Sequence, residues 1–166
     1  MQPVPLRSIK ASLSRRMRSS VEDILHFSLQ GVLPPGHMLA VNPLLRTLSY
    51  IINESSQPRL IAQQQFTAGE MGVLLPLLEA FPYYCPYEML LASFQYGNMT
   101  EVTIEHCRQY LQEAQQEGIW DQEMRPMRNV LSRARLKLRS FGIEISAIVE
   151  TGYMLTYVAD RRRKEA

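Results

Sequence analysis

The sequence has few of the residues on which metal centres, disulfide frameworks and redox chemistry depend. It holds two cysteines, Cys85 and Cys107, and three histidines, and none of them stands in a CxxC or another paired ligand spacing. No apolar run approaches the ~20 residues that a helix needs to cross a bilayer. We therefore expect no metal, no cofactor and no membrane contact, with both thiols reduced, in a protein of the cytoplasm.

Catalytic motifs are also missing. There is no GxGxxG, no P-loop and no pair of carboxylates in an apolar setting. His106 stands beside Cys107, but neighbouring residues of a helix point about 100° apart, so these two cannot act as base and nucleophile. We expect a buried Cys107, a surface His106, no catalytic residue and no enzyme.

Charge is present but unevenly distributed around a formal net charge of +2. Residues 1–20 hold five basic and no acidic side chains, residues 21–120 three basic and ten acidic, and residues 121–166 ten basic and six acidic. Two basic ends around an acidic middle suit a protein that contacts a polyanion with particular surfaces. The first end also has the composition of a mitochondrial transit peptide, which makes a mitochondrial location the alternative to a cytoplasmic one.

The N-terminal part, residues 1–36, is interpreted as a basic arm and a helix. The apolar series after the arm is Val21, Ile24, Leu25, Phe27 and Leu29. It predicts a helix over residues 8–30, which Gly31 and then Pro34 to Gly36 end. We expect this helix to form the subunit contact of a homodimer. The alternatives are that it lies along phosphates, docks on a partner protein or packs on the domain.

The following segment, as far as Gln65, has two possible structures. Three short strands are predicted, over His37 to Val41, Arg46 to Ile52 and Arg59 to Gln64. In the competing interpretation Asn42 caps a helix that Pro43 begins, because several apolar residues here also fit a helical stripe. The order of the elements that follow favours strands.

The basic segment from Arg125 to Arg139 is predicted to be an amphipathic helix. Its apolar face is Met127, Leu131, Ala134 and Leu138, and its donor face is Arg125, Asn129, Ser132 and Arg133. After Gly142 the pattern alternates, with Ile143, Ile145, Tyr153, Leu155 and Tyr157 as the apolar or aromatic positions. A helix that carries donors and precedes a hairpin is typical of the end of a winged helix-turn-helix, and it indicates a DNA duplex as the partner.

A resemblance to a known family rests on the order of several motifs. They are a helix start with Thr67 and Glu70 in a capping box (FTAGE), an apolar helix (MGVLLPLLEAF), a second helix (CPYEMLLASF), the basic helix (VLSRARLKLR) and a turn (ETGY). In this order, over residues 37–158, they resemble the DNA-binding domain of the OmpR/PhoB-type response regulators. The resemblance implies an α+β fold, a winged helix-turn-helix with an N-terminal antiparallel sheet, without a receiver domain. It also implies RNA polymerase as a protein partner.

The sequence departs from this family at several positions. An insert at about residues 97–122 is predicted to add a helix, capped by Asn98 with Glu101 and packed through Val102, Ile104, Cys107 and Leu111. Pro76 is expected to kink the first helix. Leu136 stands on the donor face where the family has a polar residue, and Val149 and Glu150 stand in the wing where the family has arginine and glycine. The basic tail, residues 159–166, is the candidate to replace that wing contact.

The predicted function is that of a sequence-specific DNA-binding transcriptional regulator with its recognition helix in the major groove. The predicted DNA-binding residues are Arg125, Arg128, Asn129, Ser132, Arg133, Arg135, Lys137 and Arg139. Among them Arg125, Asn129 and Arg133 are candidates for base edges, because Arg and Asn form bidentate bonds to guanine and adenine. The alternative is a winged-helix module that binds a protein and has no specific DNA site.

Overall fold

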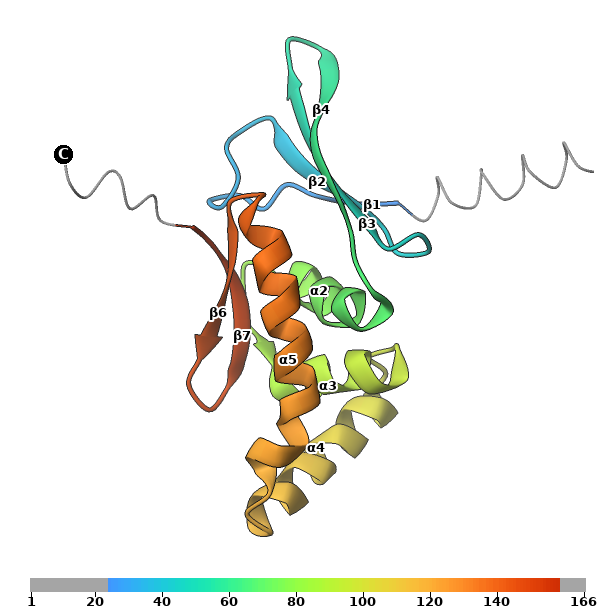
Figure 1. The fold of residues 1–166 in the computed structure, drawn as a ribbon, viewed down its shortest axis with the longest axis vertical. Helices are drawn as coiled ribbons and strands as arrows, with labels where there is room; N and C mark the ends of the chain where they lie inside the picture. The colour runs from blue at the N-terminus through green and yellow to red at the C-terminus, as the bar shows by residue number, and fades with distance from the viewer. Residues whose placement is uncertain (1–23, 159–166) are drawn as a thin grey trace, which may run out of the picture.

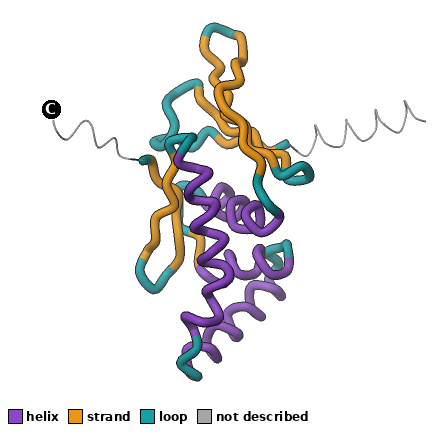
Figure 2. Tube along the Cα trace, in the orientation of Figure 1, coloured by secondary structure: helices purple, strands orange, loops and turns teal. Residues whose placement is uncertain are grey.

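The computed structural model describes residues 24–158, and within them the chain forms two antiparallel sheets and four helices (Figure 1). The elements are β1 (Leu25–Phe27), β2 (His37–Asn42), β3 (Thr47–Glu54), β4 (Gln57–Gln65), α2 (Ala68–Ala80), β5 (Cys85–Pro86), α3 (Tyr87–Tyr96), α4 (Glu101–Gln116), α5 (Trp120–Arg139), β6 (Ile143–Ile148) and β7 (Gly152–Tyr157). The first sheet has the order β1-β2-β3-β4, and the second has the order β5-β7-β6. Figure 2 shows the helices grouped together, with the β6–β7 hairpin beside them. The fold is therefore α+β, as predicted.

The segment whose structure the sequence left open is a strand. β3 pairs with β4 along its whole length and with β2 from Thr47 to Ile52, so no helix begins at Pro43. Leu39 and Val41 of β2 and Leu48 of β3 are fully buried and share one face of the sheet, while neighbouring positions point the other way. Of the apolar residues that also fitted a helical stripe, Leu48 is buried by strand alternation and by pairing across the sheet, whereas Leu44 and Leu45 are exposed in the turn between β2 and β3.

The predicted N-terminal helix is wrong where it can be compared with the structure. Leu25 to Phe27 form β1, which pairs antiparallel with β2 at Val41 to Leu39. Leu29 has a φ of 43°, a left-handed conformation that no α-helix contains, and its side chain is buried in the core. Pairing with the open edge of β2 outweighs the local helical pattern here. Residues 1–23, which carry most of the predicted helix and subunit contact, lie outside the described residues.

Helix α2 begins as the sequence predicts. The Thr67 side chain accepts a hydrogen bond from the Glu70 amide at 3.2 Å, and the Glu70 carboxylate accepts one from the Thr67 amide at 2.8 Å. Together they satisfy two backbone donors at the start of the helix. The helix runs through Pro76 as far as Ala80, so the proline does not end it. Most of its apolar residues are buried, with Leu74 and Leu77 at 0% exposure.

The insert contains α4, with two corrections to the prediction. Its N-cap is Thr100, whose hydroxyl accepts from the Thr103 amide at 3.2 Å, and not Asn98. Asn98 instead accepts a hydrogen bond from the Thr103 hydroxyl at 3.0 Å. Val102 does not pack, because 79% of its surface is exposed. The other predicted contacts are present, since Cys107 and Leu111 are buried and Ile104 packs against the core.

Within the described residues, no helix is long and apolar enough to span a membrane.

Candidate nucleic-acid interface

Helix α5 separates its apolar and polar side chains onto opposite faces. The four residues of the predicted apolar face, Met127, Leu131, Ala134 and Leu138, are all buried. The helix begins at Trp120 and not at Arg125, and the additional turn buries Met124 as well. Acidic residues lie in its first turn and basic residues in its last, which suits the helix dipole. Burial of one face therefore fixes which side chains of α5 face outward.

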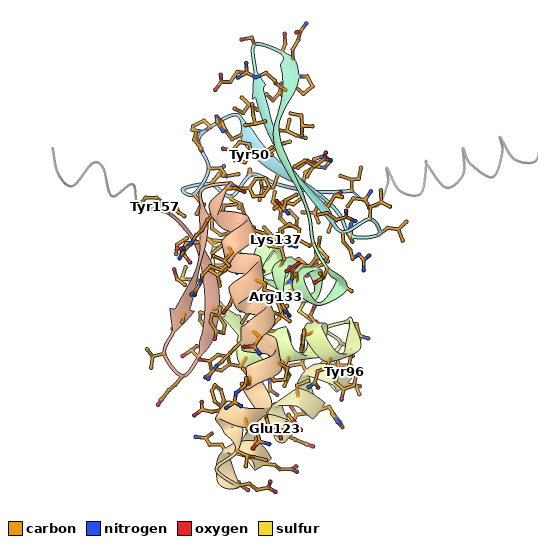
Figure 3. The ribbon with its side chains drawn as sticks, viewed as in Figure 1. Tyr50, Tyr96, Glu123, Arg133, Lys137 and Tyr157 are labelled. Atoms are coloured by element: carbon orange, nitrogen blue, oxygen red, sulfur yellow. The ribbon has the colours of Figure 1, made fainter. Side chains whose placement is uncertain are left out.

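The outward face carries a row of exposed side chains, which we call the α5 strip: Arg125, Asn129, Ser132, Arg133 and Leu136. Among residues 24–158, no side chain forms an ion pair or hydrogen bond with either arginine or with the Asn129 amide group. In Figure 1 no other described element crosses the face of α5 that is turned to the viewer, and Figure 3 shows Arg133 near the middle of the helix. The Ser132 hydroxyl donates to the Arg128 carbonyl at 3.0 Å, so Arg125, Asn129 and Arg133 supply the uncommitted donors of the strip.

Three other predicted cations lie on the flanks of α5 and have partners within the protein. Arg128 contacts Asp121 at 3.2 Å and lies 4.9 Å from the centre of the Trp120 ring. Arg135 lies 2.9 Å from Glu144 through its Nε, an ion-pair distance without hydrogen-bond alignment, and donates to the Ile145 carbonyl at 2.6 Å. Arg139 reaches the same glutamate at 3.4 Å. One carboxylate of β6 therefore holds two arginines of α5.

Lys137 joins α5 to α2. Its Nζ lies 2.6 Å from the Glu70 carboxylate and donates to the Gln65 carbonyl at 3.0 Å. The ammonium group also lies 5.3 Å from the centre of the Phe66 ring. Figure 3 places Lys137 one turn beyond Arg133. The structure thus commits this predicted DNA-binding side chain to the scaffold.

Glu70 is the acidic partner of this junction, and only 1% of its surface is exposed. Burial alone would raise the pKa of the Glu70 carboxyl, but the hydrogen bonds from Lys137 and from the Thr67 backbone outweigh burial and hold the pKa below its usual value. The sequence indicated Glu70 only as part of a capping box. Its second role was missed because its partner lies far along the chain, where no local pattern connects them.

The β6–β7 hairpin is attached to the helices through β5. Cys85 and Pro86 pair with Tyr153 and Gly152, and a Cβ atom on Gly152 would lie 2.0 Å from the Cys85 carbonyl oxygen. No side chain fits at that distance, so position 152 requires glycine. At the tip Val149 is 83% exposed, and Glu150 adopts a φ of 57°. The hairpin is therefore held by β5 close to its tip, where it presents an apolar and an acidic residue.

Aromatic side chains pack where α3, α5 and β7 meet. The Tyr87 ring lies 5.2 Å from Trp120 and 5.8 Å from Tyr153, both in edge-to-face geometry. Nearby, the Tyr110 hydroxyl of α4 donates a hydrogen bond to the Glu123 carboxylate of α5. This hydrogen bond and, to a smaller extent, burial raise the pKa of Tyr110 to about 12. These contacts fix the first turns of α5 in place.

Both cysteines are buried and carry free thiols. Burial raises the pKa of the Cys85 thiol to about 12 and raises that of Cys107, so both thiols stay protonated at neutral pH. His106 is exposed beside Tyr96, and Cys107 is buried, as predicted. Between residues 24 and 158 no three His, Cys, Asp or Glu side chains are placed to hold a metal ion.

No family model, curated protein or solved structure matches this chain.

Proposed function

We propose that this protein is a winged helix-turn-helix protein of the OmpR/PhoB type that binds double-stranded DNA at specific sequences and regulates transcription. The observation that supports the proposal most is the α5 strip, in which Arg125, Asn129 and Arg133 face outward with no partner among the described residues. Arginine and asparagine are the side chains best suited to bidentate bonds with guanine and adenine in the major groove. Their freedom from internal pairs leaves their donors available for bases.

The order of the elements also supports the proposal. A four-stranded sheet precedes α2, the short strand β5 precedes α3, and α5 is followed at once by the β6–β7 hairpin. This is the order of the motifs on which the resemblance to the family rests, with α4 as the added helix. In this arrangement α5 is the recognition helix, and the hairpin is the wing.

The proposed binding mode follows from the dimensions of a helix and a groove. An α-helix with its side chains is ~10–12 Å across, and the major groove of B-DNA is ~12 Å wide. With the α5 strip in the groove, Arg128 and Arg139 on the flanks face the phosphates, because 40% and 55% of their side-chain surfaces are exposed despite their pairs. Phosphate contacts of this kind fix register without reading sequence. Lys137 is excluded from the interface because it holds Glu70.

The wing has a positioning role in this proposal. Glu150 at its tip would repel phosphates, and Glu144 at its base holds two flanking arginines of α5. The wing therefore orients α5 and does not enter the minor groove. A homodimer would place two α5 helices on two half-sites about one helical turn apart, which multiplies the specificity of a single helix.

Selection of bound duplexes from a random library, followed by titration of the selected site and a scrambled one, tests the proposal. Arg133→Ala is expected to lose ~1–3 kcal/mol of preference for the selected site. Arg139→Ala is expected to weaken both duplexes alike and to flatten the salt dependence. Arg59→Ala, an exposed arginine on β4 in the first sheet, is the matched control and should change neither. The groove assignment fails if Arg133→Ala and Arg59→Ala behave alike.

A second candidate function is a winged-helix module that binds a protein such as RNA polymerase. Two observations favour it: Leu136 is 65% exposed on the α5 strip, and Val102 is 79% exposed on α4. Val102 borders a groove of about 860 Å³ between α3 and α4, which Glu101 and Glu105 also line. In this case the library selection yields no preferred duplex, and Val102→Asp abolishes binding to purified RNA polymerase.

A further inference from the structure

The leucine within the α5 strip is apolar in an otherwise polar row. Leu136 follows Ser132 by one turn, and the residues three and four positions before and after it are serine or arginine. Its side chain is 65% exposed, so no other described element covers it. Arg125, Asn129 and Ser132 precede it at helical spacing on the same line of α5. Whatever occupies the face of the strip therefore meets an apolar group at this position.

The edges of the bases offer a single kind of apolar group in the major groove, the C5-methyl of thymine. Guanine, adenine and cytosine present acceptors and donors there, which Leu136 cannot bond. Along the helix axis Leu136 lies ~4.5 Å beyond Arg133, a distance of roughly one base pair. An isobutyl side chain among donors thus selects for a methyl group close to the base that Arg133 contacts.

We propose that Leu136 contacts the C5-methyl of a thymine and so specifies thymine at one position of the bound site, within about two base pairs of the base read by Arg133. This inference rests on the proposed DNA-binding function and adds a specificity-determining residue to it. The contact removes one methyl group and part of the leucine from water. For one buried carbon of this kind we expect about a fourfold gain in affinity.

A scan of the selected duplex with deoxyuridine tests the contact, because deoxyuridine lacks the methyl group and keeps every hydrogen-bonding atom of thymine. Each thymine of the site is replaced in turn, and binding is measured by fluorescence anisotropy at one salt concentration. For the unsubstituted protein, one replacement near the Arg133 position should weaken binding about fourfold. For Leu136→Ala, the same replacement should have no effect, and binding to the unmodified site should already be weaker.

The control variant is Leu45→Ala, which shortens an exposed leucine in the turn between β2 and β3. It should bind as the parent does and keep the full deoxyuridine effect. If the parent binds a selected duplex but no thymine methyl matters, or if the effect persists in Leu136→Ala, the leucine contact is wrong while DNA binding stands. If selection yields no preferred duplex, both the contact and the proposed function are wrong.

Discussion

Replacement of Lys137 by methionine removes the cation of the Glu70–Lys137 pair and keeps most of the side-chain volume. The variant leaves a carboxylate of 1% exposure without its 2.6 Å partner. A hydrogen bond to a charged group contributes ~1.5–3 kcal/mol, and removal of one member of a fully buried pair costs ~3–5 kcal/mol. Because 29% of the Lys137 side chain is exposed, water screens part of this interaction. We therefore expect a loss of about 2 kcal/mol in the free energy of unfolding.

Urea denaturation followed by fluorescence measures this loss conveniently, because Trp120 at the start of α5 is the single tryptophan of the chain. A companion variant, Glu70→Gln, removes the charge and keeps an oxygen that can accept from the Thr67 amide. In the double variant no buried charge is left unpaired. We expect it to be more stable than the sum of the two single losses predicts, by ~1 kcal/mol or more. Simple additivity of the two losses would show that the pair does not connect α2 with α5.

The pair also predicts how the effect of Lys137→Met depends on pH. The pKa of Glu70 is lowered in the folded protein, so its contribution to stability is present above the unfolded pKa of ~4.3 and is lost as pH falls through the folded pKa. The difference in unfolding free energy between the parent and Lys137→Met should therefore shrink as pH falls below about 4. An equal difference at neutral pH and at pH 3 would contradict the assigned ionisation of Glu70.

Three further substitutions test other parts of the structure. Gly152→Ala should lower the free energy of unfolding, measured by urea denaturation, by on the order of 3 kcal/mol, because its Cβ would lie 2.0 Å from the Cys85 carbonyl oxygen. Gly69→Ala is the control and should cost little, because the nearest atoms to its Cβ would lie at 3.5 Å. Equal losses for the two variants would refute the close approach at Gly152. Thr100→Ala should cost ~1 kcal/mol by removing the cap of α4, and an unchanged unfolding midpoint would show that the cap contributes nothing. Glu144→Gln should strengthen binding to selected and scrambled duplexes alike by freeing two arginines of α5, and unaltered affinity would place those arginines away from phosphates.

Local periodicity predicted the features of this fold that depend on residues near one another in the chain. The burial of Met127 and Leu138 on one face of α5 follows from helical spacing, and the cap at Thr67 follows from residues three positions apart. Leu25 to Phe27 were predicted to be helical but form a strand that pairs with β2. Pairing with another strand cannot be inferred from the spacing of apolar residues within the segment itself. Val102 was predicted to pack, but the groove beside it is open.

In the candidate site too, helical spacing predicted which side chains face outward, but not which of them pair with residues far along the chain. The sequence placed Arg125, Asn129 and Arg133 on the outward face, and the structure has them exposed there. It could not separate these arginines from Lys137, because all are cations on one helix. What distinguishes Lys137 is Glu70, which approaches it only after α2 and α5 pack together. Charge can be read from sequence, whereas the pairing of charges depends on the tertiary structure.

The close approach at Gly152 has a consequence for the way this chain can change over evolutionary time. At the tip of the hairpin Val149 is exposed, so substitutions there can change the surface of the wing without disturbing its packing. Position 152, three residues later, tolerates no substitution, because any other residue would place a Cβ atom where the Cys85 carbonyl oxygen already lies. Descendants of this protein should therefore vary at Val149 and keep glycine at position 152, although both positions lie at the same end of the hairpin and the invariant residue has no side chain.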